Sequence, residues 1–164
     1  MRLFAGIYPP LSMVEDLAKL AGRLKQIYPT AAFVKPDRMH VTLRFFGDAE
    51  AADAARSIET AIADTAAFDL ELDHIDSFPN RESARVLHCG LKEPEFVERM
   101  ISAMARPDDR EPHAHMTLAR FRPKQSVELA AIEPLVFRAA KVTLVNSVLG
   151  ANSRYEVVRE WTLR

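Results

Sequence analysis

The stretch "DRMHVTLRFFG", residues 37–47, decides the fold, because a shorter copy of it returns as "HAHMTLARF" at residues 113–121. Each copy has a histidine, a threonine two places later, a leucine directly after it, and a phenylalanine three further on. These residues are His40, Thr42, Leu43 and Phe46 in the first copy, and His115, Thr117, Leu118 and Phe121 in the second. Apolar and polar residues alternate along both copies, which is typical of a half-buried strand. The repeat predicts two halves of similar construction, each contributing one motif strand.

Residues two apart on a strand point to the same face of the sheet. In the first copy, alternation predicts one face with His40, Thr42, Arg44 and Phe46, and a core face with Val41, Leu43 and Phe45. In the second copy, His115 and Thr117 share a face, while Met116 and Leu118 point into the core. The polar faces of both strands are therefore expected to line one site. Phe46 and Phe121 could stack on a nucleobase there, although aromatic residues at strand ends are more often part of a core.

The rest of the chain alternates irregularly between short helical and strand-like patterns. A capping box at Ser12 and Glu15 marks the first helix, a polar loop is expected at 106–112, and a turn follows at 150–153. Strands are predicted at 2–8, 39–46, 68–75, 83–91, 135–149 and 154–163, and helices at 12–27, 51–64, 94–104 and 126–132. Amphipathic strands favour antiparallel pairing and an α+β fold over a doubly wound parallel sheet. Without an evident linker, residues 1–164 are expected to form one domain.

Composition limits the functions that are possible. The net charge of −1 gives no overall basic field, so any anionic partner must be held by a local cluster of Arg and Lys. A single cysteine, Cys89, excludes an internal disulfide and a cysteine-based zinc site, and suits a reducing compartment. No apolar run approaches a membrane span, and Pro9 and Pro10 interrupt the first apolar stretch before it resembles a signal sequence. These features predict a cytoplasmic protein with no membrane partner.

Two histidines that face one another form a recognisable catalytic device. Imidazole has an unperturbed pKa of ~6.5, so one ring can take a proton from water while the other gives a proton to a leaving oxygen. Two threonine hydroxyls beside them can donate hydrogen bonds to an anion between the rings. Arg44 and Arg120 lie close in sequence, with further cations outside them at Lys35, Arg38, Arg122 and Lys124. This set of groups suits phosphodiester cleavage without a metal.

Two plainer interpretations compete with that one. A single His-x-Thr on a strand is usually structural, because such side chains often only satisfy each other's hydrogen bonds. His113 and His115 also form an H-x-H pair that could bind a metal with a third ligand from His40, His74 or His88. No acidic residue flanks either motif on the same face, however, and a metal site would leave the repeated threonine unexplained. His74 and His88 are otherwise expected to be structural, and Cys89 to be a small core residue.

The paired motifs resemble those of the 2H phosphoesterase superfamily, and more narrowly the RNA 2′,3′-cyclic phosphodiesterases, also labelled 2′-5′ RNA ligase-like. The resemblance extends over nearly the whole chain, through "MRLFAGIYPP", "VKPDRMHVTLRFFG", "SFPNRESARVLHCGL", "HMTLARF" and "SRYEVVREWTL". It implies a two-lobed α+β fold with pseudo-twofold duplicated antiparallel sheets, outer helices and a central cleft. It also implies hydrolysis of RNA 2′,3′-cyclic phosphate ends, or cyclic nucleotides, to 2′-phosphates without metal or cofactor. The protein is expected to act as a monomer.

At matching positions the resemblance implies His40 as proton donor and His115 as proton acceptor, with Thr42, Thr117 and Arg120 binding the phosphate. Alternation along a flat strand places Arg120 on the face opposite His115 and Thr117. This role therefore needs a strand end, a bulge, or a side chain that bends around the edge of the strand. Two departures concern the second motif. Ala114 stands where the family usually has proline, and the segment 91–115 is shorter than usual. Three alternatives stay open: another small cyclic phosphate as substrate, a 2′,5′-linked oligonucleotide, or a non-catalytic module that binds RNA ends or nucleotides.

Overall fold

The computed structural model describes residues 1–107 and 109–164. Within this part of the chain there are three α-helices, two short 3-10 helices and nine strands. In chain order they are β1 (Arg2–Ile7), η1 (Leu11–Met13), α1 (Val14–Ile27), β2 (Ala32–Phe33), η2 (Pro36–Arg38), β3 (Val41–Asp48), α2 (Ala51–Ile62), β4 (Phe68–Phe78), β5 (Ala84–Leu91), α3 (Glu95–Met104), β6 (His115–Gln125), β7 (Ala130–Ala139), β8 (Lys141–Val148) and β9 (Arg154–Thr162).

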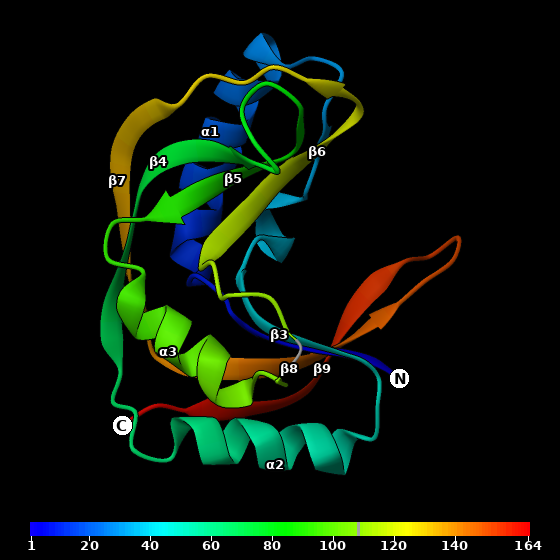
Figure 1. Ribbon diagram of the computed structural model, residues 1–164, viewed down its shortest axis with the longest axis vertical. Coiled ribbons are helices and arrows are strands. Elements are labelled where there is room, and N and C mark those ends of the chain that lie inside the picture. The colour runs from blue at the N-terminus through cyan, green and yellow to red at the C-terminus, as the bar shows by residue number, and fades with distance from the viewer. Residues whose placement is uncertain (108) are drawn as a thin grey trace.

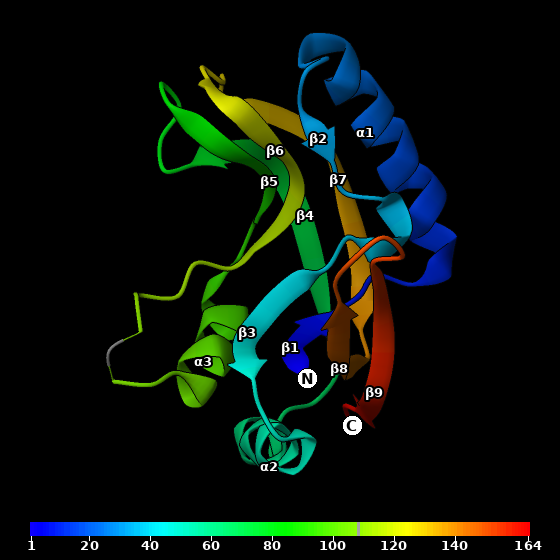
Figure 2. The same ribbon diagram turned by 90° about the vertical axis from the view of Figure 1, so that its right-hand side faces the viewer.

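The strands form one sheet in the order β7-β4-β5-β6-β3-β1-β8-β9, with β2 paired to β6. Every strand pair of the described residues is antiparallel, which confirms the predicted α+β class. The two motif strands, β3 and β6, lie next to each other at the centre. In the described part of the chain one residue pair, Val41 with Met116, joins them. Apart from β2, the sheet therefore consists of two halves of four strands each, seen as an upper and a lower lobe in Figure 2.

The two halves repeat the same order of elements around their motif strands. A helix follows β1 and precedes β3 in one half, and a helix follows β5 and precedes β6 in the other. Each of these helices lies against the opposite half, because α1 lies beside β7 and α3 contacts β3 (Figures 1 and 2). The buried face of α1 carries Leu17, Leu20 and Leu24. This exchange extends one apolar core beneath both halves.

Helix α1 does not begin as predicted. The chain first forms the 3-10 turn η1, and Met13 occupies the N-cap position of α1 without a side-chain capping bond. The expected capping box of Ser12 and Glu15 is therefore wrong, because the prolines before η1 hold the entry in an extended conformation that shifts the helix start by two residues.

The C-terminal third differs most from the sequence-based expectation. No helix forms at 126–132, which lies wholly in the described residues. Val127 is instead buried, its N–H bonded to the carbonyl of Arg81 at 2.7 Å. The expected strand 135–149 is two strands, β7 and β8, separated at Ala140. Strand β7 pairs with β4 and β8 pairs with β1, so the chain crosses here from one half-sheet to the other. The pattern of apolar residues does not reveal this crossing. Of the expected loop 106–112, residue 108 lies outside the described residues.

Candidate active site

The pairing of Val41 with Met116 fixes how the two motifs meet. Extending this antiparallel register by one residue in each direction places His40 opposite Thr117 and Thr42 opposite His115. Side chains directly opposite on antiparallel strands have Cβ atoms roughly 5 Å apart. All four side chains lie on the face opposite the buried Val41 and Met116. We call this surface, formed by His40, Thr42, His115 and Thr117, the motif face.

A β-bulge interrupts each motif strand directly after its threonine. On β3 the partners pass from Gly6–Thr42 to Ala5–Arg44, and Leu43 is the extra residue. On β6 they pass from His88–Thr117 to Leu87–Ala119, and Leu118 is the extra residue. An extra residue reverses which side chains point to which face beyond it. The leucine of His-x-Thr-Leu therefore has the same geometric role in both halves.

The bulge in β6 explains how Arg120 can lie on the same face as His115 and Thr117. Leu118 and Ala119 are both fully buried, and Arg120 is exposed beyond them. The side chain therefore points to the side of His115 and Thr117, where alternation along a flat strand had excluded it. The positive charge of Arg120 lies close enough to His115 to lower the pKa of that imidazole.

The bulge in β3 has the same effect on Phe45, which alternation had assigned to the core. That assignment is wrong: Phe45 is 70% exposed, with its ring centroid 5.9 Å from that of Phe4. The two residues suggested for stacking on a base are instead packed inward. Phe121 is buried with its ring edge-on to Tyr28 at 5.5 Å, and Phe46 is half-buried against the core. Phe45 occupies, in the first motif, the position that Arg120 has in the second.

The His40 ring lies flat in an aromatic slot. It is stacked between Phe4 and Tyr8, with ring centroids at 4.8 Å and 4.9 Å. It also lies over Gly6, where a Cβ would stand 3.0 Å from the imidazole Cδ2. Glycine is therefore needed on β1 for the ring to lie this close to the strand. The slot withdraws the imidazole from water, and this burial is the main reason that the pKa of His40 is lowered.

Both motif histidines use the same hydrogen bond to fix their tautomer. The Nδ1–H of His40 donates to the carbonyl of Arg38 at 2.7 Å, and that of His115 donates to the carbonyl of His113 at 2.7 Å. Nε2 is therefore the atom that each neutral ring presents as an acceptor. In His40 it lies 3.0 Å from the hydroxyl oxygen of Thr42. Two imidazoles with fixed tautomers, each beside a threonine, can exchange protons with a group held between them.

The His115 ring lies against an aromatic wall. Phe78 and His88 approach it with ring centroids at 4.8 Å and 5.1 Å. Burial is the largest cause of the lowered pKa of His115, and electrostatic interaction with His113 and Arg120 lowers that pKa further. These effects favour the neutral ring, which is the form that can accept a proton.

His88 is the most enclosed histidine of this wall. It is 1% exposed and stacks on Phe78 at 4.1 Å, and neither ring nitrogen has a hydrogen-bond partner among the described residues. Burial lowers the pKa of His88 to about 4, so the ring is neutral near pH 7. Cys89 is buried beside it, as predicted, and burial raises the pKa of that thiol to about 12.

The geometry gives no support to the metal alternative. Among residues 1–107 and 109–164, no group of three or more His, Cys, Asp and Glu side chains is arranged to hold a metal ion. The rings of His113 and His115 are 6.1 Å apart, and Phe78 packs against both. His74 lies elsewhere on β4, its Nδ1 2.6 Å from the carboxylate of Asp73.

The cations near the motifs divide into two groups. Arg44 points away from the motif face, donating to the carbonyl of Met104 at 2.8 Å and to the Asp109 carboxylate at 2.7 Å. Arg38 stays beside the motif face and donates to the carbonyl of Ser153 at 3.0 Å. Arg44 is therefore committed to holding the segment after α3, and sequence proximity alone misplaced it.

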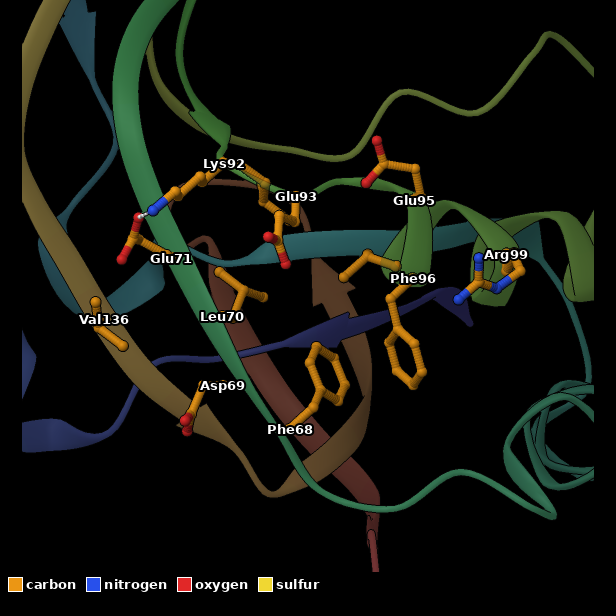
Figure 3. Close-up of a pocket in the computed structure, with 12 residues that line it drawn as sticks. Phe68, Asp69, Leu70, Glu71, Lys92, Glu93, Glu95, Phe96, Arg99 and Val136 are labelled. Carbon is orange, nitrogen blue, oxygen red and sulfur yellow. Dashed lines mark ion pairs between the residues drawn. The ribbon is translucent and has the colours of Figure 1, made fainter.

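Of the cavities in the described part of the chain, two lie next to residues that surround the motif face. One of about 580 Å³ is lined by Tyr8, Arg38 and Tyr155, which surround His40. The other, of about 760 Å³, is lined by Arg85, Val86, Arg120, Phe121, Arg122, Pro123 and Lys124. A third cavity of about 620 Å³, between α3 and strand β4, includes no residue of either motif (Figure 3).

Residues 7–88, half of the chain, match the family model described as LigT like phosphoesterase. The chain belongs to the LigT-like phosphoesterase family. Among curated proteins, the phosphoesterase is 26% identical over 144 residues to an RNA 2′,3′-cyclic phosphodiesterase of Methanothermobacter thermautotrophicus, covering 80% of this chain and 78% of the relative. It is 30% identical over 120 residues to a protein of the same description from Aeropyrum pernix, covering 67% and 68% of the two chains. The protein is thus a hydrolase of the 2H phosphoesterase superfamily.

Solved structures agree with this assignment. The structure of E. coli LigT in apo form matches with a TM-score of 0.74 at 26% identity, covering 99% of this chain and 96% of that one. A Thermus thermophilus protein matches with a TM-score of 0.80 at 22% identity, covering 100% and 98%, and this likeness concerns the fold. The phosphoesterase thus shares the α+β architecture of these proteins. In the described residues, no helix combines the length and apolar character that a membrane crossing requires.

Proposed function

We propose that the phosphoesterase hydrolyses 2′,3′-cyclic phosphate ends of RNA to 2′-phosphates, using His40 as general acid and His115 as general base without a metal. The observation that supports this most is the meeting of both His-x-Thr motifs on one face, with the Nε2 of each histidine left to act. The curated relatives are named RNA 2′,3′-cyclic phosphodiesterases, and one E. coli LigT structure is described as complexed with phosphate. We also propose that residues 1–164 act as a single domain, as a monomer.

In the proposed reaction, the cyclic phosphate lies between the two imidazoles. Neutral His115 takes a proton from water at Nε2 as the water oxygen attacks phosphorus. Protonated His40 gives its Nε2 proton to the departing 3′ oxygen, and the phosphate remains on the 2′ oxygen. Each proton transfer contributes roughly 10²- to 10⁴-fold in rate. The same groups act whether the cyclic phosphate ends an RNA or belongs to a nucleotide.

Thr42, Thr117 and Arg120 are proposed to hold the phosphate. Each threonine stands opposite the histidine of the other motif, so the hydroxyls flank the space between the rings. Arg120 reaches the same side because of the bulge at Leu118. A bound anion also adjusts the acid, because a negative charge beside an imidazole raises its pKa. In this way substrate binding would counteract the slot that lowers the pKa of His40.

The decisive assay is product analysis on a cyclic-ended oligoribonucleotide and on 2′,3′-cyclic nucleotides, with and without EDTA. We expect 2′-phosphate products, no loss with EDTA, and loss of at least about 100-fold for His40→Ala and for His115→Ala. Circular dichroism would verify that both variants are folded. Full activity in either variant, or inhibition by EDTA that added metal reverses, would refute the proposal. Turnover of a 2′,5′-linked oligonucleotide alone, or binding without turnover, would support one of the alternatives instead.

A further inference from the structure

We propose that single-stranded RNA upstream of the cyclic end lies along the cavity beside β5 and β6, held through its phosphates by Arg85, Arg122 and Lys124. We call this cavity the basic groove; it is lined by Arg85, Val86, Arg120, Phe121, Arg122, Pro123 and Lys124 and measures about 760 Å³. This inference rests on the proposed function, since it names the partner of the same site. It also predicts that the groove affects oligonucleotides and not mononucleotides, which does not follow from the two motifs alone.

The charges of the basic groove are not neutralised by the described part of the protein. Of the described residues, no carboxylate lies within 4 Å of the charged groups of Arg85, Arg120, Arg122 or Lys124. By contrast, the cations of the cavity beside His40 are largely paired, as Arg138 is with Asp69. A chain with a net charge of −1 thus concentrates these four cations in one groove. Such a local cluster can hold phosphates without an overall basic field.

The basic groove begins at the motif face. Its first residue, Arg120, is also the residue whose charge reaches His115. From there β6 continues outward, with Arg122, Pro123 and Lys124 all exposed and the pairing with β5 irregular up to Gln125. Cationic side chains that line a groove in this way can track the backbone of a single strand. The groove can therefore engage the phosphates upstream of the reacting one.

The direction of β6 matches the direction in which the RNA must leave. His40 stands opposite Thr117, and Arg120 lies beyond Thr117 on β6, so the groove extends from the His40 end of the motif face. His40 is the proposed donor to the 3′ oxygen, so the ribose that carries this oxygen lies at the same end. The rest of the RNA is attached to that ribose and can enter the groove directly.

The third cavity offers the opposite environment. It is lined by four carboxylates, Asp69, Glu71, Glu93 and Glu95, with only Lys92 and Arg99 as cations (Figure 3). Lys92 is already engaged by Glu71 at 3.4 Å. Phosphates would be repelled there, so electrostatics select the basic groove as the path of the strand.

The test compares a variant with Arg85→Gln, Arg122→Gln and Lys124→Gln against the wild type, with Arg120 retained. The matched control carries Lys19→Gln, Arg23→Gln and Lys25→Gln, three exposed residues of α1. In Figure 2 this helix lies on the opposite side of the molecule from β5. The first readout is the Kd of a fluorescent single-stranded oligoribonucleotide ending in a 2′-phosphate, measured by anisotropy over a range of salt. The second is kcat/KM on a cyclic-ended oligoribonucleotide and on a 2′,3′-cyclic mononucleotide.

We expect the groove variant to weaken oligonucleotide binding on the order of tenfold, and to reduce the slope of log K against log salt by about 2, at about 0.7 per phosphate contact. The control should leave both unchanged, and mononucleotide turnover should equal that of the wild type. Restoring charge with Arg85→Lys and Arg122→Lys should recover binding. An unchanged Kd and salt slope in the groove variant, or equal losses in the control, would overturn the inference. Oligonucleotide binding that depends on the groove without any turnover would contradict the proposed function and leave the groove standing.

Discussion

His88→Leu should make the stability of the phosphoesterase less sensitive to acid. In the wild type the ring is 1% exposed and burial lowers its pKa from 6.5 to about 4. The folded state therefore excludes a proton that the unfolded state takes up below pH 6.5. The stability that depends on the neutral ring is fully present above pH 6.5 and is lost as the pH falls towards 4. At about 1.4 kcal/mol per pKa unit, the loss by pH 4 is about 3 kcal/mol.

The assay is urea unfolding of wild type and variant at pH 7, 6, 5 and 4, chosen as roughly the window between the two pKa values. The free energy of unfolding of the variant, relative to the wild type, should rise by about 3 kcal/mol between the two ends of this series. Other carboxyl and histidine groups titrate in both proteins, so their contributions largely cancel. At pH 7 the variant should be close to the wild type or more stable, because it removes two buried nitrogens that have no partner among the described residues. A difference that stays constant with pH would refute the claim that His88 is buried and neutral.

Three further predictions concern single side chains, two at the motif face and one on β5. Arg120→Gln should move the acid limb of kcat/KM to higher pH, because the guanidinium lowers the pKa of His115; an unmoved limb would contradict the bulged geometry. Inorganic phosphate should raise the pKa of His40 in an NMR titration, since an anion between the rings favours the charged imidazole, and the absence of a shift would place the anion elsewhere. Gly90→Ala should shift the NMR signals of His74 while the fold is retained, because a Cβ at Gly90 would collide with that ring; unchanged signals would show that the ring does not lie there.

The sequence predicts the central feature of this fold because the motif is written twice. Two amphipathic strands with the same polar residues indicate a shared site, and the structure brings His40, Thr42, His115 and Thr117 to one face. The α+β class follows from the alternation of polar and apolar residues, which is a local property. The catalytic and phosphate-binding roles of these residues remain predictions, which the assays described above test.

The features that the sequence could not predict depend on contacts between distant segments. Whether a strand bulges depends on the strand with which it pairs. The predictions that Phe45 points inward and that Arg120 points away from His115 both assumed flat strands, but β3 and β6 are both bulged. The segment 126–132 was expected to form a helix. Residues 126–129 instead connect β6 to β7, residues 130–132 begin β7, and the N–H of Val127 bonds to the carbonyl of Arg81. Arg44 stands beside Thr42 in sequence, but its ion pair with Asp109 turns it away.

The central claim is the division of labour between His40 and His115, and the pH dependence of kcat/KM in two variants tests it most directly. A general acid must be protonated and a general base neutral, so His40 accounts for the alkaline limb of the wild-type profile and His115 for the acid limb. We predict that the residual activity of His40→Ala no longer falls at alkaline pH, and that of His115→Ala no longer falls at acid pH. Loss of the acid limb in His40→Ala, or both limbs intact in either variant, would contradict this account.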